Sequence, residues 1–189
     1  MAKIILASGS PRRQELLGRI GIRDFQISVP QVEEVCPEGL TPQETVCRIS
    51  RQKSAAVASG PEDIVITADT MVFLDDKRLG KPRDEADALR MLSALQGRSH
   101  LVCTGVTVRQ ADTLLTRAQT TQVWFRPASE AELKAYIRSG EPMDKAGAYG
   151  VQGLGALLVE RIDGDFFNVM GLPVVLLSRM LAQFGVTLL

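Results

Sequence analysis

The sequence contains few of the residues that build disulfide scaffolds or metal centres. It has three cysteines, Cys36, Cys47 and Cys103, and a single histidine, His100. Three scattered cysteines predict reduced thiols and form neither a disulfide framework nor a metal-binding pair, and one histidine cannot supply a histidine-based metal cluster. His100 lies in an alternating segment, so we expect a strand residue and not a catalyst. A bound metal would therefore be a hard cation held by carboxylates and substrate phosphate.

An excess of charge of one sign and long apolar runs are missing as well. Lysine plus arginine equals aspartate plus glutamate, at 22 each, so the net charge favours neither nucleic acid nor an anionic membrane as a partner. The apolar run near the amino terminus is too short for a signal-peptide core, and no stretch is long enough to span a membrane. We expect a cytoplasmic protein that forms one domain, or one two-lobed unit, over residues 1–189.

The first distinctive stretch is I-I-L-A-S-G-S-P-R-R, from Ile4 to Arg13. It predicts a buried strand, a tight turn and a helix that Ser10 caps, with Pro11 at its first position and Gly18 or Gly21 at its end. The helix N-terminus, the serine hydroxyls and two guanidinium groups would together bind an anion, most simply phosphate. The alternative is an ordinary strand and helix with solvated arginines.

The remaining pattern predicts strands that alternate with helices, typical of an α/β fold. We expect strands at 25–29, 63–68 and 154–162, a hairpin of 100–109 with 120–126, and a hairpin turn at 163–164. Capping residues predict a helix from Thr41 to about Ser59, one that starts at Asp84 and ends just before Gly97, and one that starts at Ser129 and ends before Gly140. A final helix is expected from Val174 to Phe184. Trp124 and Phe125 are expected to fill the core or a dimer interface.

Charged residues follow several of these elements. Asp69 and Thr70 come directly after the apolar run at 63–68, and ligand sites in open α/β sheets lie beyond the carboxyl ends of strands. The alternative for Asp69 is a capping or turn residue, and for Lys81 a solvated loop residue. Glu33 and Glu34 are paired carboxylates that could equally be solvated.

A glycine-rich segment, G-E-P-M-D-K-A-G-A-Y-G-V-Q-G, spans Gly140 to Gly153. Its four glycines predict a loop that approaches another group closely or adopts positive φ angles. Asp144 and Lys145 supply opposite charges there, and the amide of Gln152 could read a base edge. The alternative is a long structural turn.

Five blocks in order carry a family resemblance: S-G-S-P-R-R, E-E, A-D-T, G-K-P-R-D and D-K-A-G-A-Y-G-V-Q-G. They resemble the signature of the Maf family of nucleotide pyrophosphatases, over the whole chain. The resemblance implies a Maf/ITPase-like α/β fold, a two-lobed single unit with a central mixed, twisted sheet flanked by helices and an active-site cleft between the lobes.

The resemblance also implies roles for individual residues. Asp69 would accept the proton of the attacking water, and Lys81 would be catalytic with it. Asp69 and Asp144 would hold a divalent cation, Mg²⁺ or Mn²⁺. The substrate-binding residues would be Ser8, Arg12, Arg13, Glu33, Glu34, Lys53, Thr70, Lys145 and Gln152, of which Arg12, Thr70 and Gln152 would govern the choice of base.

The combination of blocks is similar to the branch of the family that hydrolyses dTTP and UTP. It implies a homodimeric housecleaning enzyme that also takes modified pyrimidine nucleotides and produces the monophosphate and pyrophosphate. One alternative is a nucleotide-binding regulator of cell division or septum formation that does not hydrolyse, and therefore does not need Asp69 and Lys81 together. Another is an interaction protein that binds no nucleotide.

Overall fold

The computed structural model of the protein describes residues 3–33 and 35–189, so Glu34 of the predicted carboxylate pair lies outside the described residues. The chain divides into two compact units. Unit 1 comprises Met1–Asp69, Thr104–Gln119 and Gly171–Leu189, and unit 2 comprises Thr70–Cys103 and Thr120–Met170. Each unit therefore collects segments that are far apart in the sequence.

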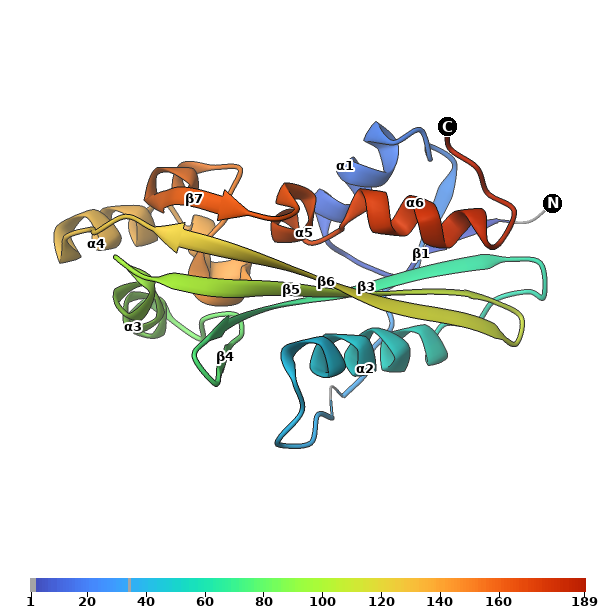
Figure 1. Cartoon of the computed structure of the whole chain (residues 1–189), viewed down its shortest axis with the longest axis horizontal. Coiled ribbons are helices and arrows are strands. Elements are labelled where there is room, and N and C mark those ends of the chain that lie inside the picture. The colour runs from blue at the N-terminus through green and yellow to red at the C-terminus, as the bar shows by residue number, and fades with distance from the viewer. Residues whose placement is uncertain (1–2, 34) are drawn as a thin grey trace. The chain divides into compact units, whose positions relative to one another are not determined.

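The strands form a mixed sheet in the order β2-β1-β3-β5-β6-β7, with β4 paired to β3 (Figure 1). β1 runs parallel to both β2 and β3, whereas β4 is antiparallel to β3 and β7 is antiparallel to β6. The bounds are Ile4–Leu6 for β1, Phe25–Ile27 for β2, Ile64–Leu74 for β3, Lys77–Leu79 for β4, Ser99–Gln110 for β5, Thr113–Phe125 for β6 and Val159–Asp163 for β7. The predicted α/β class with a mixed sheet flanked by helices is confirmed.

Helices connect most of these strands. The α-helices are α1 (Pro11–Arg19), α2 (Pro42–Ala55), α3 (Glu85–Leu95), α4 (Glu130–Arg138), α5 (Phe166–Met170) and α6 (Val174–Ala182). Three 3₁₀ helices lie in and after the glycine-rich segment: η1 (Glu141–Asp144), η2 (Ala146–Ala148) and η3 (Leu154–Leu158). Within residues 3–33 and 35–189, no helix has the length and apolarity to cross a membrane.

The helix ends follow most of the predicted capping signals. Thr41 and Ser129 form complete capping boxes at α2 and α4, and the carboxylate of Asp84 caps α3. Ser10 is at the N-cap position of α1 and Pro11 at the first helical position, as predicted, but among the described residues the Ser10 side chain makes no capping hydrogen bond. Gly21, at φ 93°, ends α1: its N–H and that of the next residue bond back to the last turn, as in a Schellman motif.

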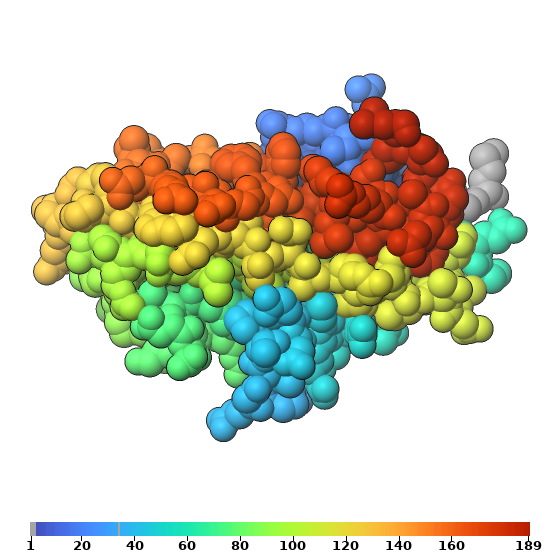
Figure 2. Space-filling model, in the orientation of Figure 1, coloured from blue at the N-terminus to red at the C-terminus, as the bar shows by residue number. Residues whose placement is uncertain are grey.

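In unit 1, helices cover both sides of the strands. α2 lies on one side of β3, β5 and β6, and α6 lies on the other (Figure 1). Gly105 on β5 explains how closely α2 packs, because a Cβ at this position would overlap the backbone of Val46 in the helix. In the space-filling view, α1 and the carboxyl-terminal segment of unit 1 lie against each other (Figure 2).

The core of unit 2 is built around α3 and α4, which pack against each other. Phe125, Tyr149 and His100 meet edge to face, with ring centroids 4.7 to 5.3 Å apart. His100 Nε2 and the Tyr149 hydroxyl share a hydrogen bond of 2.8 Å. His100 is a residue of β5, as predicted, and the expectation that it is not a catalyst stays a prediction.

Several predicted bounds are wrong. The second hairpin strand begins at Thr113 instead of residue 120, because the turn is confined to Ala111 and an aspartate. The range 154–162 is a 3₁₀ helix followed by a short strand, and the expected hairpin turn at 163–164 leads into α5. Here the strand-like apolar pattern is used by a helical turn that buries Leu158 in the core of unit 2.

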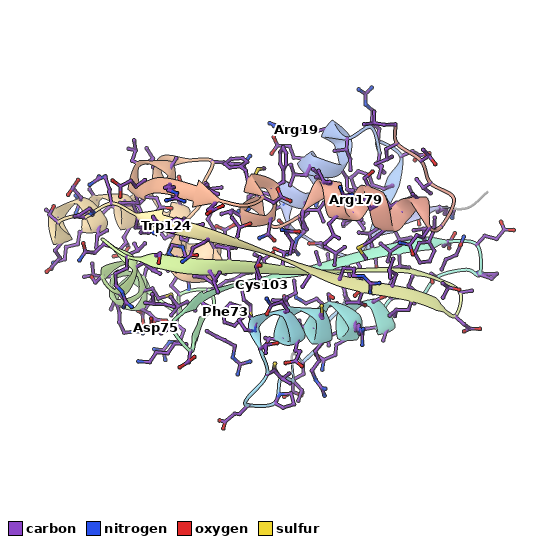
Figure 3. The ribbon with its side chains drawn as sticks, viewed as in Figure 1. Arg19, Phe73, Asp75, Cys103, Trp124 and Arg179 are labelled. Carbon is purple, nitrogen blue, oxygen red and sulfur yellow. The ribbon has the colours of Figure 1, made fainter. Side chains whose placement is uncertain are left out.

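Other differences concern single side chains and helix ends. α2 ends at Ala55, a few residues before the predicted end, and α6 ends at Ala182. β4 was not predicted; it pairs with β3 beyond the turn that carries Asp75 (Figure 3). Trp124, expected in the core or a dimer interface, is half-buried on β6, where Arg161 lies over its ring at 4.5 Å.

Candidate active site

The predicted phosphate-binding turn is linked by hydrogen bonds to the carboxyl-terminal segment of unit 1. Ser8 follows β1 and is buried, with a relative exposure of 7%. Arg13 Nη1 donates to Ser8 Oγ at 3.1 Å, and Arg13 Nε donates to the carbonyl of Gly171 at 2.7 Å. The Ser8 hydroxyl also accepts a hydrogen bond from the N–H of Ser10. The turn is thus held in one conformation with a guanidinium group beside a buried serine.

Lys53 and Asp69 form the second feature of unit 1. Lys53 Nζ, on α2, donates to Asp69 Oδ1 at 2.6 Å, and the two side chains are only 20% and 9% exposed. The other carboxylate oxygen, Oδ2, is buried and has no hydrogen-bond partner among the described residues. Asp69 therefore presents one oxygen that is fixed by a cation and one oxygen that can accept a proton or coordinate a cation.

The position of Asp69 on the strand differs from the prediction. Asp69 lies inside β3 instead of at its end, because the strand continues to Leu74. β1 pairs only with Ile64–Ile66 of β3, so Asp69 stands beyond the carboxyl end of β1, on the same edge as Ser8. Asp69 therefore lies beyond the carboxyl end of a strand, but that strand is the neighbouring β1 and not β3.

Hydrogen bonds from hydroxyl groups and from one arginine hold α2 on the strands of unit 1. The buried hydroxyl of Thr107 shares hydrogen bonds with Ser50 Oγ at 2.8 Å and Thr116 Oγ1 at 2.9 Å. Thr67 on β3 donates to the carbonyl of Ser50, and Arg109 donates to carbonyls at the end of α2. This network fixes the helix that carries Lys53 against the strand that carries Asp69.

Arg12 and Glu33 are the other predicted residues of unit 1. Arg12 is half-buried in the first turn of α1, next to the Ser8 turn. Glu33 is exposed in the loop between β2 and α2. The roles predicted for both remain predictions, and that for Glu34 falls outside the described residues.

Unit 2 contains the rest of the predicted set. Thr70 is half-buried on β3, and Lys81 is exposed just after β4. The N–H of Gly147 donates to the carbonyl of Gly80 at 3.0 Å, so the Lys81 segment lies beside the glycine-rich segment. Gly147 has φ 71°, and a Cβ there would lie 2.8 Å from a methyl group of Val72. The glycine is therefore required both by the backbone conformation and by a close approach.

Lys145 is tied to the same segment. Its ammonium donates to Asp144 Oδ1 and to the carbonyl of Glu141, both at 2.6 Å, and its side chain is 14% exposed. Gln152 is exposed. Asp144 thus has one oxygen engaged by Lys145, and Gln152 has its side chain available to a ligand from solvent.

Sequence reasoning assigned no role to Glu141, Tyr136 or Arg109. Glu141 stands in the quoted glycine-rich string, but nothing local marks it, because its partners at Leu154 and Gly155 are 13 and 14 residues away. Arg109 is 55 residues from its partner Ser54. The several glycines that follow Glu141 within a short segment are the sequence signal that could have drawn attention to it.

A metal centre made only of protein ligands is not visible in the described part of the chain. No group of three or more histidine, cysteine, aspartate and glutamate side chains there could hold an ion. The free oxygen of Asp69 does fit a hard cation such as Mg²⁺, which binds few carboxylates and shares its other positions with water and phosphate.

These features are typical of an α/β protein that binds a phosphorylated ligand: a serine and arginine turn after a parallel strand, with a lysine and aspartate pair beyond that strand's end. Comparison with known families is more specific. Residues 3–184 match the profile of the family described as "Maf-like protein". The chain belongs to the Maf family.

Three relatives named dTTP/UTP pyrophosphatase are similar to this chain over nearly their full length. The protein from Carboxydothermus hydrogenoformans is 50% identical, covering 97% of this chain and 99% of the relative. The protein from Bacillus velezensis is 49% identical over 97% of both chains. The protein from Symbiobacterium thermophilum is 48% identical, covering 98% of this chain and 95% of the relative.

Two solved structures share the fold. The Ham1 protein of Staphylococcus aureus aligns with a TM-score of 0.54 at 15% identity, covering 96% of this chain and 98% of that one. A HAM1 protein from Coxiella burnetii gives the same TM-score at 14% identity, covering 97% and 100%. At these identities the likeness concerns the fold alone, which agrees with the predicted Maf/ITPase-like class.

Proposed function

We propose that this protein is a nucleoside triphosphate pyrophosphatase that hydrolyses dTTP and UTP to the monophosphate and pyrophosphate. Relatives with this name share about half of their residues with the chain over nearly its full length. The observation that carries the proposal in the structure is Asp69, a buried carboxylate with one oxygen held by Lys53 and the other without a partner among the described residues.

The chemistry requires a water to be positioned and deprotonated while negative charge on the phosphates is balanced by fixed cations. Asp69 Oδ2 would accept the proton of the attacking water. Lys53 keeps Oδ1 occupied, so the carboxylate has one orientation and need not reorganise. The water oxygen then bonds to phosphorus, the anhydride bond between the α and β phosphates breaks, and pyrophosphate leaves.

Cationic side chains would bind the triphosphate. Arg13 is presented beside Ser8 by its bond to the Gly171 carbonyl, and a planar guanidinium can contact phosphate oxygens in pairs. Arg12 and Lys81 are the other candidates from the family resemblance, and Gln152 is the candidate for reading the base.

The divalent cation, Mg²⁺ or Mn²⁺, and its coordination by Asp69 and Asp144 stay predictions from the family resemblance; such a cation would neutralise phosphate charge when bound. The homodimer, the cytoplasmic location, the absence of a nucleic-acid partner and the turnover of modified pyrimidine nucleotides stay predictions from the sequence.

The test compares wild-type protein with Asp69→Asn. Each is incubated with UTP or dTTP and Mg²⁺, and pyrophosphate, orthophosphate and nucleoside monophosphate are measured separately. We expect the wild type to release equimolar monophosphate and pyrophosphate, and the variant to lose at least about 100-fold in kcat because the proton acceptor is gone.

Asp63→Asn provides the matched control. Asp63 precedes β3 and accepts hydrogen bonds only from backbone N–H groups of Gly60 and Lys3 among the contacts described. Its substitution should leave kcat near the wild-type value. Wild-type turnover by Asp69→Asn would contradict the role of Asp69, and binding of UTP without any turnover would favour the regulator that does not hydrolyse.

A further inference from the structure

The glycine-rich segment of unit 2 is folded around a carboxylate of its own. Glu141 Oε2 accepts the N–H of Leu154 at 2.8 Å, and Glu141 Oε1 accepts the N–H of Gly155 at 3.1 Å. Oε1 also accepts the hydroxyl proton of Tyr136 at 2.9 Å. These loop N–H groups therefore already have an anionic partner, and that partner belongs to the protein.

The glycines of the segment make room for this arrangement. A Cβ at Gly153 would overlap Glu141 Oε2, and one at Gly150 would lie 2.7 Å from the Lys145 side chain and 3.2 Å from Glu141 Oε1. A Cβ at Gly155 would lie 2.5 Å from the Tyr136 hydroxyl. Gly153 has a negative φ of −106°, so no left-handed conformation requires glycine there, and the atoms nearest to an added Cβ are those of the Glu141 carboxylate.

Tyr136 supports the other side of the same turn. Its hydroxyl accepts the N–H of Gly150 at 3.0 Å while it donates to Glu141. Burial raises the pKa of Tyr136, so the hydroxyl keeps its proton and stays a donor. Burial also raises the pKa of Glu141, but the hydrogen bonds from Gly155, Leu154 and Tyr136 outweigh it and leave the pKa below its ordinary value, so the group is a carboxylate at neutral pH.

Gln152 stands between the points that are held. Gly150 is bound two residues before it, and Leu154 is bound two residues after it. Because the Gln152 side chain is exposed, the backbone sets its position. We propose that Glu141 is a positioning residue for base selection, which fixes the 150–155 turn and thereby aims the Gln152 amide at the pyrimidine.

This inference rests on the proposed function and on Gln152 as the residue that reads the base. Glu141 also holds Lys145, through its main-chain carbonyl. That contact uses the backbone, so substituting the Glu141 side chain removes the support of the turn and leaves the Lys145 contact possible. The two roles can therefore be separated by mutation.

The test measures kcat and KM for UTP, dTTP, CTP and dCTP in wild type, Glu141→Ala, Gln152→Ala and the double variant. We expect Glu141→Ala to lower kcat/KM for UTP about tenfold, mainly through KM, and to lower the UTP to CTP preference to the level of Gln152→Ala. The double variant should be no less selective than either single one, because both changes remove the same interaction.

Glu132→Ala is the matched control. Glu132 lies in the same unit and accepts hydrogen bonds from the Ser129 N–H and hydroxyl and from Arg126, but it caps α4 and does not contact the 150–155 turn in the hydrogen bonds described. This variant should be less stable than wild type with an unchanged UTP to CTP preference. A loss of preference in Glu132→Ala as well would overturn the proposal, because it would then reflect general loosening.

Tyr136→Phe keeps the test decisive if Glu141→Ala does not fold. It retains the buried ring, loses the bond to Gly150 and should lower the preference for UTP by about threefold. Full wild-type preference in whichever of these variants folds, or additive losses in the double variant, would overturn the proposal. So would a wild type that hydrolyses UTP and CTP equally well. A wild type that releases no pyrophosphate would instead overturn the proposed function.

Discussion

The two units hold their candidate residues by different chemistry. In unit 1, the helix that carries Lys53 is fixed mainly by uncharged hydroxyl groups centred on Thr107, with Arg109 at its end, and by Gly105, which lets the helix approach the strand. In unit 2, the turn that carries Gln152 is fixed by an ionised carboxylate, Glu141, inside a set of glycines. Hydroxyl groups do not titrate between neutral pH and mild acid, whereas a carboxylate is protonated as the pH falls.

The two kinds of support suit the two different structures that they hold, a packed helix in unit 1 and a glycine turn in unit 2. A helix docked on strands through short hydroxyl groups has its depth set by packing, which suits a lysine that must meet a carboxylate at 2.6 Å. A turn of glycines has no side chains to pack, so its conformation depends on hydrogen bonds to backbone N–H groups. A carboxylate can accept several of these bonds at once.

The largest effect on stability should come from a substitution at Gly105, where α2 approaches β5 closely. Gly105→Ala would place a methyl group in the backbone of Val46, so α2 must move away from the strand. We expect a loss of about 3 kcal/mol or more in unfolding free energy. Urea denaturation measures this, and kcat should fall in the fraction that remains folded, because Lys53 moves with α2.

Gly18→Ala is the control for that change. Gly18 lies within α1, and no described atom outside its own helix lies within 4 Å of the point that an added methyl group would occupy. Alanine should therefore stabilise the helix by about 0.5–1 kcal/mol. Equal stability of the two alanine variants would show that α2 does not depend on the close approach at Gly105.

The next largest effect should be a fall in unfolding free energy when unit 2 is exposed to acid. Burial lowers the pKa of His100 from 6.5 to about 4, and its Nδ1 has no hydrogen-bond partner in the described part of the chain. The folded state therefore favours neutral histidine. Its contribution to stability is complete above pH 6.5 and declines as the pH falls towards 4, because the unfolded chain binds the proton first. The loss should reach at most about 3 kcal/mol.

Urea unfolding between pH 8 and pH 4 tests this in wild type and in His100→Phe. The variant should show a shallower decline in that window, and parallel curves would contradict the prediction. Glu141 acts at lower pH: its folded pKa lies below 4.5, so its contribution is lost as the pH falls below that value. At pH 4, hydrogen exchange corrected for the intrinsic rate should therefore have increased more in unit 2 than around the hydroxyl groups of unit 1, relative to pH 8.

The smallest of these effects should come from single hydroxyl groups. Thr107→Val removes the central member of the unit 1 network, and Thr121→Val removes a hydroxyl in unit 2 that bonds Asp165 and Asn168. Each should lower the unfolding free energy by about 1 kcal/mol. Only Thr107→Val should also lower kcat, since Thr107 supports the helix of Lys53. A change of kcat in both variants, or in neither, would remove the distinction between the units.

Much of the fold could be predicted because its signals are local. The capping boxes at Thr41 and Ser129 lie within three residues of their partners, and the amphipathic pattern of α3 is complete within eleven residues. The predictions failed where an apolar run had two possible uses. The segment after Gly153 has the composition of a strand, but of its leucines only Leu158 is buried in unit 2's core, and Glu141 accepts the N–H groups of Leu154 and Gly155 in the 3₁₀ helix.

By itself, the sequence determined the order of most strands and helices, most helix ends and the five blocks that identify the Maf family. The tertiary structure alone decided that Asp69 meets Lys53, that Arg13 reaches a carbonyl 158 residues away, and that the glycines surround Glu141. Local patterns reflect neighbours along the chain. Contacts between distant residues depend on how parallel strands and their crossovers bring segments together, and no single segment contains that information.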